Sequence, residues 1–179
     1  MKRVIIILLF CLLSPGVFAQ GGSTNRYEVG LGCAPFIGRY MSSDGGPNVK
    51  YYMRSFFEWR RETGRLVDYG AKISYMLGPY TQYLPTGRQK GMNHNYQILA
   101  VADVSIIPNC YLGLSIGPSL DLISSQSSKT IESFFGFGAG PRIGIEIQKH
   151  FRISADTFFT IGDSVYFMQP ICLNLGWTF

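Results

Sequence analysis

The sequence predicts an all-β fold: a transmembrane, eight-stranded, antiparallel up-and-down β-barrel preceded by a cleaved signal peptide. Three observations support this prediction. Apolar residues alternate with polar residues or glycine in eight segments of the 179-residue chain. The connections between these segments alternate between long and short. The alternation continues to the last residue, Phe179.

The first segment of the chain is not part of the predicted barrel. It has a basic start, an apolar run too short to span a bilayer, and the small residue Ala19 at its end. We therefore expect a signal peptide at 1–19, cleaved before Gln20, and a barrel domain at 20–179.

The composition narrows the class of protein. A hydrophobic content of 46% excludes intrinsic disorder. No apolar run of 18 residues follows the signal, so no membrane-spanning helix is predicted. No basic stripe remains in the mature chain, so no nucleic-acid partner is expected. Its three cysteines are predicted to be free thiols, with Cys33 facing outward and Cys172 facing inward, and with Cys110 as the third.

The strands are predicted from the alternating segments, in order, at 27–39, 48–62, 65–78, 94–107, 110–124, 131–148, 151–162 and 166–179. The loops at 41–47, 79–93 and 125–130 are long or polar, whereas 63–64, 108–109 and 149–150 are tight turns. If the chain enters from the periplasm, the long connections lie outside the cell and the tight turns lie in the periplasm. A soluble lipocalin would also have eight strands, but not this asymmetry.

The two faces of the strands differ in chemistry. In the second strand one face is apolar and the other carries Lys50, Tyr52, Arg54, Phe56, Glu58 and Arg60. In the sixth strand the face that carries Arg142 and Glu146 also carries Gly136, Gly138 and Gly140. Charged residues and glycines therefore share one face of these strands. Such a face is better suited to line a crowded lumen than to face water. We expect large residues of strand two to reach across the lumen toward these glycines; the alternative is that the glycines relieve strand curvature.

Aromatic residues become more frequent toward both ends of the predicted strands, as expected for the two girdles of aromatic side chains at the membrane–water interfaces. The predicted periplasmic girdle consists of Trp59, Tyr69, Tyr111, Trp177 and Phe179. The predicted outer girdle consists of Tyr75, Tyr96, Phe135, Phe159 and Tyr166.

Four sequence features resemble those of a known family. They are the run Gly136–Arg142, the pair Gly117–Pro118, the start at Gln20 and the aromatic end at Trp177–Phe179. With them, the chain resembles the small eight-stranded outer-membrane β-barrel proteins, typified by the transmembrane domain of outer membrane protein A, and the porin-like outer-membrane β-barrels of Bacteroidota. The resemblance implies a bacterial outer-membrane location and recognition of the strand ending at Phe179 by the barrel assembly machinery. The peptidoglycan-binding domain of outer membrane protein A has no counterpart in this chain.

The predicted lumen holds six cations and seven anions, near balance, which indicates an ion network that fills the interior. Its members are Glu28, Lys50, Arg54, Glu58, Arg60, Asp68, Lys72, Asp103, Asp121, Arg142, Glu146, Arg152 and Asp156. An eight-stranded barrel is only wide enough for its own side chains, which favours a plugged barrel. The alternative is a narrow porin-like channel for small solutes or ions.

A lipid A-modifying enzyme is a third hypothesis, because such enzymes are built on similar barrels. The chain has only two histidines, and no catalytic triad can be assembled around His94 or His150. No enzymatic activity, metal site or cofactor is therefore predicted.

The remaining candidate surface is the outer loop 79–93. Its residues Tyr80, Tyr83, Arg88 and Lys90 are of types that anchor protein interfaces or the phosphates of lipopolysaccharide. The alternative is a solvated loop without a partner. The predicted function is thus a structural or interaction role in the outer membrane, in contact with its lipid and lipopolysaccharide and with an unidentified protein at the outer loops.

Overall fold

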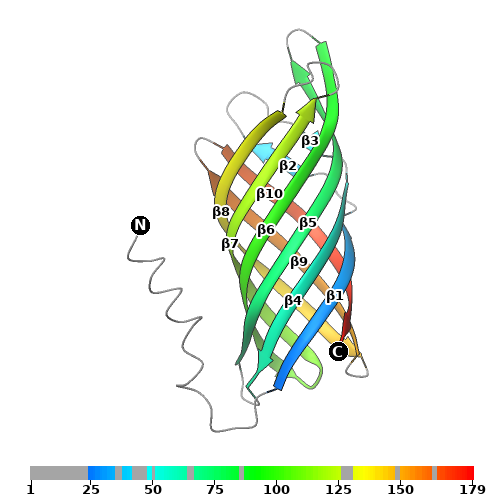
Figure 1. Cartoon of the computed structure of the whole chain (residues 1–179), viewed down its shortest axis with the longest axis vertical. Helices are drawn as coiled ribbons and strands as arrows, with labels where there is room; N and C mark the ends of the chain where they lie inside the picture. The colour runs from blue at the N-terminus through cyan, green and yellow to red at the C-terminus, as the bar shows by residue number, and fades with distance from the viewer. Residues whose placement is uncertain are drawn as a thin grey trace, which may run out of the picture.

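The computed structural model describes residues 24–34, 38–41, 48–49, 51–63, 67–84, 87–125, 131–147, 150–162 and 165–179 (Figure 1). The predicted signal peptide, 1–19, lies outside these residues. Among the residues that the structure describes, no helix is long and apolar enough to cross a membrane.

The described elements are all β-strands, and they close into one barrel (Figure 1). Their bounds are β1 Thr24–Ala34, β2 Gly38–Met41, β3 Asn48–Val49, β4 Tyr52–Glu62, β5 Val67–Leu84, β6 Gly87–Ile107, β7 Cys110–Ser125, β8 Ile131–Ile147, β9 Phe151–Gly162 and β10 Val165–Thr178. Each long strand pairs antiparallel with the next along the chain, and β1 pairs with both β4 and β10. The short strands β2 and β3 continue the first two long strands, so the predicted eight-stranded up-and-down barrel is confirmed.

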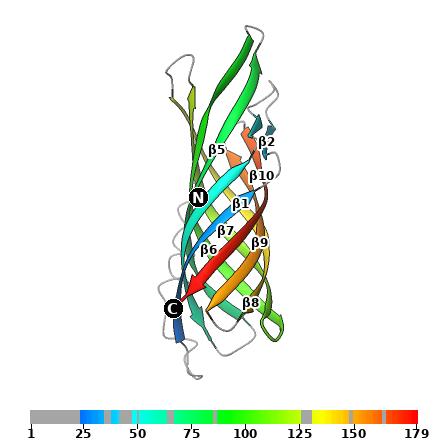
Figure 2. The same cartoon turned by 90° about the vertical axis from the view of Figure 1, so that its right-hand side faces the viewer.

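The two ends of the barrel differ. One end, here called the turn end, holds the described chain ends and the tight connection at Pro108 and Asn109, where Asn109 has a φ of 66°. There Tyr27 and Phe179 exchange backbone hydrogen bonds of 3.0 and 2.9 Å, which join the first strand to the last. At the opposite end, here called the hairpin end, β5 and β6 rise beyond the other strands (Figure 2).

The long hairpin corrects the predicted loop at 79–93. The paired register of β5 and β6 runs without a break to Leu84 and Gly87, and only 85–86 separates the strands. The sequence misled because Pro79 is a poor residue for a central strand. Here β4 pairs with β5 only up to Leu77, so a missing N–H group at Pro79 costs no bond to β4.

A bulge in β10 interrupts the predicted alternation of the last strand. The register with β9 shifts between Gln169 and Cys172, and both of these side chains are buried although their numbers differ in parity. Pro170 lies within the shift, as expected for a residue that cannot donate to the ladder. Cys172 nevertheless faces inward and Cys33 is exposed, as the sequence predicts.

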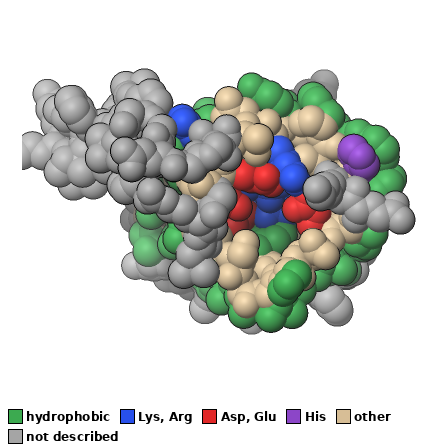
Figure 3. All heavy atoms as spheres, turned by 90° about the horizontal axis from the view of Figure 1, so that it is seen from below, with side chains coloured by type: hydrophobic (Ala, Val, Ile, Leu, Met, Phe, Trp, Pro, Cys, Tyr) green, Lys and Arg blue, Asp and Glu red, His purple; other side chains and the backbone are tan. Residues whose placement is uncertain are grey.

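The outside of the barrel is apolar and the inside is charged. Leu31, Ile98 and Phe135 expose 61–69% of their surface, whereas ten charged side chains expose 8% or less. A view from the turn end shows acidic and basic side chains gathered within a ring of hydrophobic ones (Figure 3). The predicted sidedness is therefore confirmed, because lipid is the solvent that suits such an exterior.

Among the girdle residues whose side chains the structure describes, one was assigned to the wrong face. Tyr111 was predicted to face outward at the periplasmic rim, but it is buried in the lumen, and Leu112 and Leu114 carry the outward face of β7. Tyr111 is the register partner of Gly144 on β8, and because Gly144 has no side chain, the Tyr111 ring fits inside the lumen.

Candidate functional site: the filled lumen and the outer hairpin

The charged side chains reach the lumen because alternate residues of a strand point to the same face. On β4 this places Arg54, Glu58 and Arg60 inside, at successive levels from the middle of the barrel toward the turn end. The other strands add their inward residues at matching levels. Two ion clusters result, one near the turn end and one nearer the middle.

The cluster near the turn end contains three cations and three anions and is called here the balanced cluster. Its members are Glu28, Glu58, Arg60, Asp103, Arg142 and Arg152. Arg142 binds Glu58 through two hydrogen bonds, Nη1 to Oε2 at 3.0 Å and Nη2 to Oε1 at 2.8 Å. This paired geometry joins β8 to β4 across the lumen, and such bidentate bonds are among the strongest in proteins.

Arg152 connects the remaining acids of the balanced cluster. Its Nη1 lies 3.0 Å from Glu58 Oε1 and 3.4 Å from Glu28 Oε2, and its Nη2 lies 2.5 Å from Asp103 Oδ2. Its guanidinium carbon lies 3.5 Å from the centroid of the Tyr111 ring. A single guanidinium therefore ties together carboxylates from three other strands.

The second cluster, here called the upper cluster, shares one carboxylate between two cations. Asp156 lies 2.5 Å from Arg54 Nη1 and 3.0 Å from Lys72 Nζ, and it accepts a bond of 3.3 Å from Asn174 Nδ2. The Lys72 ammonium also lies 4.5 Å from the centroid of the Phe56 ring. These contacts compensate for two buried cations that one carboxylate alone would balance incompletely.

The other predicted network members lie apart from these clusters. Asp68 accepts a 2.9 Å bond from the backbone N–H of Thr63, and Asp121 accepts a 3.3 Å bond from Asn93 Nδ2. Glu146 pairs with Arg26 near the turn end. Lys50 lies outside the described residues.

Sequence reasoning missed the rim pair formed by Arg26 and Glu62. Arg26 Nε lies 2.8 Å from Glu62 Oε1, and the same guanidinium contacts Glu146. Arg26 precedes the predicted first strand at 27–39, so its face was not assigned. The alternation extended by one residue would have placed it inside with Glu28.

Above the upper cluster the lumen is filled by uncharged polar side chains, which the sequence analysis also left out. Ser74 Oγ donates to Gln97 Oε1 at 3.0 Å, and Gln97 Nε2 donates to Gln169 Oε1 at 3.1 Å. Asn95 Nδ2 donates to Ser119 Oγ at 2.9 Å. Their inward parity was the available signal.

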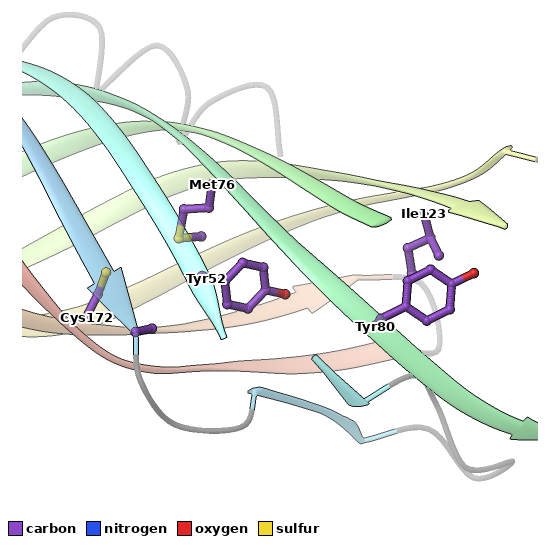
Figure 4. Close-up of a cluster of buried hydrophobic side chains, with 6 residues drawn as sticks. Tyr52, Met76, Tyr80, Ile123 and Cys172 are labelled. Atoms are coloured by element: carbon purple, nitrogen blue, oxygen red, sulfur yellow. The ribbon is translucent and has the colours of Figure 1, made fainter. Parts of the chain in front are cut away.

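Apolar side chains occupy the lumen at the hairpin end, in a group called here the apolar cluster (Figure 4). Its members are Ala34, Tyr52, Met76, Tyr80, Ile123 and Cys172. Tyr52 is fully buried, and its hydroxyl accepts a bond of 3.0 Å from Asn93 Nδ2. The lumen is thus filled along its length, by ion pairs near the turn end and by apolar side chains at the hairpin end.

The glycines make room for neighbours rather than for residues opposite. A Cβ added at Gly138 would meet Phe158, and one added at Gly136 would meet Thr160, both on adjacent β9. The expected reach of Tyr52, Arg54 and Phe56 into this space is therefore wrong; the Phe56 ring lies over Gly30 of neighbouring β1. Adjacent strands lie closer than opposite ones, so the short-range contact fills the space first.

The four candidate contact residues of the outer loop lie on the hairpin instead. Tyr80 is only 3% exposed, because it packs into the apolar cluster, and it is therefore not an outer contact. Tyr83 and Arg88 are register partners next to the tip, and the structure does not describe their side chains. Lys90 is exposed.

The two histidines lie at opposite ends of the barrel. His94 Nδ1 is 2.8 Å from the Tyr75 hydroxyl, and the ring of His150 stacks on Trp177 with centroids 5.6 Å apart. In the part of the chain that the structure describes, no group of three or more histidine, cysteine or acidic side chains could hold a metal ion.

No protein-family model and no curated protein matches this chain. Solved structures do match it. The chain is similar to Ail, the attachment invasion locus protein of Yersinia pestis, at 17% identity and a TM-score of 0.62, over 87% of this chain and 99% of that one. It is also similar to the N-terminal barrel of OprF from Pseudomonas aeruginosa (12% identity, TM-score 0.56, 88% and 99% covered). Neisserial surface protein A gives 12% identity and a TM-score of 0.52, with 88% and 97% covered.

The chain has the fold of the small outer-membrane β-barrels. At these identities the likeness establishes the fold alone, and it agrees with the apolar exterior. The predicted outer-membrane β-barrel is thereby confirmed. By the orientation predicted from the sequence, the turn end would be periplasmic and the hairpin end external, because short turns of outer-membrane barrels face the periplasm and longer connections face outward.

Proposed function

We propose that this protein is a closed, non-conducting and non-enzymatic barrel that anchors the β5–β6 hairpin as an interaction surface outside the cell. The observation that supports closure is the lumen itself. Arg142 and Arg152 tie Glu58 and Asp103 together across it, and each of these four side chains is almost fully buried. A barrel of eight strands has no width left for a path around them.

Planar-bilayer recordings of the purified protein test closure. We expect no steady conductance from the native protein. The double variant Glu58→Ala with Arg142→Ala removes a neutral pair and shortens two side chains, and it should introduce openings. Steady, salt-dependent conductance of the native barrel would instead support the narrow-channel alternative.

The hairpin supports the interaction role because it extends past the neighbouring strands and carries cations. Lys90 is exposed, and Arg88 lies opposite Tyr83 near the tip. The structure of Ail was solved with the heparin analogue sucrose octasulfate, a sulfated sugar. We therefore propose that the partner is polyanionic, a sulfated or phosphorylated polysaccharide, to which basic side chains bind through charge-assisted hydrogen bonds.

A shortened hairpin tests this role. Replacing 82–89 by Asn-Gly closes a two-residue turn between the register partners Thr81 and Lys90 and leaves Tyr80 in the apolar cluster. We expect binding to immobilised sucrose octasulfate to fall in this variant and in Arg88→Gln, but not in Arg61→Gln at the turn end. Equal binding by all four proteins would remove the hairpin from the proposal.

The same proposal assigns no catalysis to His94 and gives the terminal strand a role in assembly. The hydrogen-bond partner of His94 is Tyr75 rather than a serine or carboxylate. Lipid A acylation should therefore be the same in cells with and without the protein. Deleting Phe179 should lower the amount of assembled barrel, because we propose that the assembly machinery binds the strand that it ends.

A further inference from the structure

Tyr75 and His94 form a hydrogen-bonded pair on the lipid-facing side of the barrel, toward the hairpin end. The Tyr75 hydroxyl lies 2.8 Å from His94 Nδ1. The Tyr75 ring is also close to Tyr96, with centroids 5.0 Å apart. Asn93 and Asn95, on either side of His94, are completely buried in the lumen, so the pair faces away from the lumen.

The hydrogen bond orients the chemistry of the histidine. The donor in this bond depends on the histidine tautomer: where the Tyr75 hydroxyl donates to Nδ1, the ring proton lies on Nε2, the nitrogen that this bond does not use. Nε2–H is then a fixed donor at the surface. His94 is half-buried on the outward face of β6, and among the described residues its only hydrogen-bond partner is Tyr75, so Nε2 is left to bind a ligand from outside the barrel.

The pair lies at a boundary in surface chemistry. Toward the turn end on the same faces, Ile73 lies two residues from Tyr75 and Ile98 lies four residues from His94, and both are more than half exposed, as hydrocarbon contacts should be. Lys90, four residues from His94 toward the hairpin tip, is an exposed cation of the same parity. No acidic residue is present among the described outward side chains of β4 to β7 at this end. Such a change from apolar to polar and basic side chains is expected at the level of the lipid head groups, and an exposed lysine there is complementary to phosphate.

A lipid-facing groove starts on β4, the strand next to the one that carries Tyr75. Ser55 is the register partner of Tyr75 and lines a groove of about 480 Å³. Its other outward walls are the apolar side chains of Val29, Leu31, Phe151, Leu175 and Trp177. The lining residues of the groove extend from Ser55 and Leu31 to Trp177 and Phe151 near the turn end.

We propose that Tyr75 and His94 bind the phosphate of an anionic glycolipid of the outer leaflet, with Lys90 as the neighbouring cation and one acyl chain in the groove beside Ser55. The His94 Nε2–H donates to a phosphate oxygen, and Tyr75 positions the ring. This inference requires that the barrel lies in an outer membrane. It does not depend on a closed lumen or on a partner at the hairpin tip.

Lipid retention by the whole mature barrel tests the site. The protein is placed in phosphatidylcholine nanodiscs that contain bisphosphorylated lipid A, and retained lipid is counted by native mass spectrometry. His94→Phe keeps the ring and removes the nitrogens, and Tyr75→Phe removes only the hydroxyl. We expect retention to fall about tenfold in His94→Phe, the loss that one charge-assisted bond implies, and to fall less in Tyr75→Phe.

His150→Phe is the matched control, because His150 also contacts an aromatic ring but lies at the turn end. It should retain lipid A as the native protein does, and lipid A without phosphates should be retained weakly by all variants. Equal retention by native and His94→Phe proteins, or equal retention of both lipids, would overturn the proposal. Displacement of the His94 ring resonances by inorganic phosphate as strongly as by lipid A would overturn the lipid assignment. The shortened hairpin retains His94 and Lys90, so its failure to bind polyanions is a separate result.

Discussion

Arg142 and Glu58 meet across the lumen, 84 residues apart in the chain, and form two hydrogen bonds between fully buried side chains. Each residue also has an oppositely charged register partner on an adjacent strand, Asp156 for Arg142 and Lys72 for Glu58, but those two partners bind each other in the upper cluster. Glu58 also accepts a bond from Arg152. This carboxylate is therefore the centre of the balanced cluster and the residue whose loss should be felt most.

Replacing Glu58 by glutamine should lower the free energy of unfolding by about 3–5 kcal/mol, because the three buried guanidinium groups of the balanced cluster would then share only two carboxylates, Glu28 and Asp103. Urea titration of the barrel in detergent or lipid measures the change. Glu62→Gln provides the control. Glu62 is paired with Arg26, but both are about a quarter exposed, so its loss should cost less than about 1 kcal/mol. Equal effects at both positions would contradict the importance of burial.

Lipid-facing positions should show a dependence on depth. Ile73 lies six residues along β5 from its turn-end residue Val67, and its register partners Phe57 and Ile98 are also exposed apolar residues, so Ile73→Arg in the middle of the apolar belt should cost about 2–4 kcal/mol of unfolding free energy. Ile106 is equally exposed but lies beside the turn at Pro108, where Ile106→Arg should cost about 0–1 kcal/mol. Unfolding titrations in lipid vesicles compare the two. A similar cost at both sites would mean that the apolar belt is misplaced.

Crowding in the lumen should appear at Gly144. A Cβ at this position would meet the ring and hydroxyl of Tyr111, and we expect Gly144→Ala to destabilise the barrel by about 1–3 kcal/mol. A double-mutant cycle with Tyr111→Leu, which removes the ring, isolates the contact. The alanine should cost much less in the Tyr111→Leu background. Additive effects would show that the glycine is needed for strand curvature, not for space.

The reactivity of the cysteines should distinguish the outer face of the barrel from the lumen. Cys33 is exposed on the lipid side of β1, whereas Cys172 is completely buried in the apolar cluster. We expect a small maleimide to modify Cys33 in the folded protein and to reach Cys172 only after denaturation, as measured by peptide mass spectrometry. Modification of Cys172 in the folded state would mean that the lumen opens at the hairpin end.

The local faces of the strands could be read from the sequence, because side chains alternate with a period of two and lipid tolerates only one kind of face. In this way Arg54, Glu58 and Arg60 were placed inside, and the apolar face of the same strand outside. Where the period is disturbed, the reading failed. Pro79 concealed strand continuity at the hairpin, and Tyr111 was assigned outward because aromatic residues occur on both faces.

The partners of the lumen residues could not be predicted at the same level. Whether Arg142 meets Glu58 or Asp156 depends on the register of every strand between them and on the length of each side chain. The same holds for Tyr75 and His94, whose neighbouring strands were predicted to end in a loop. Contacts of this kind are set by closure of the ring and not by any local pattern.

The sequence by itself determined that this protein is a closed sheet with an apolar exterior, since alternation and connection length are local properties that each strand carries alone. The tertiary structure decided which charges neutralise one another, that Tyr80 fills the lumen, and that β5 and β6 extend beyond the barrel. The physical reason is that neutralisation and packing are properties of pairs, and only the closed ring brings distant residues to within a few ångströms of each other.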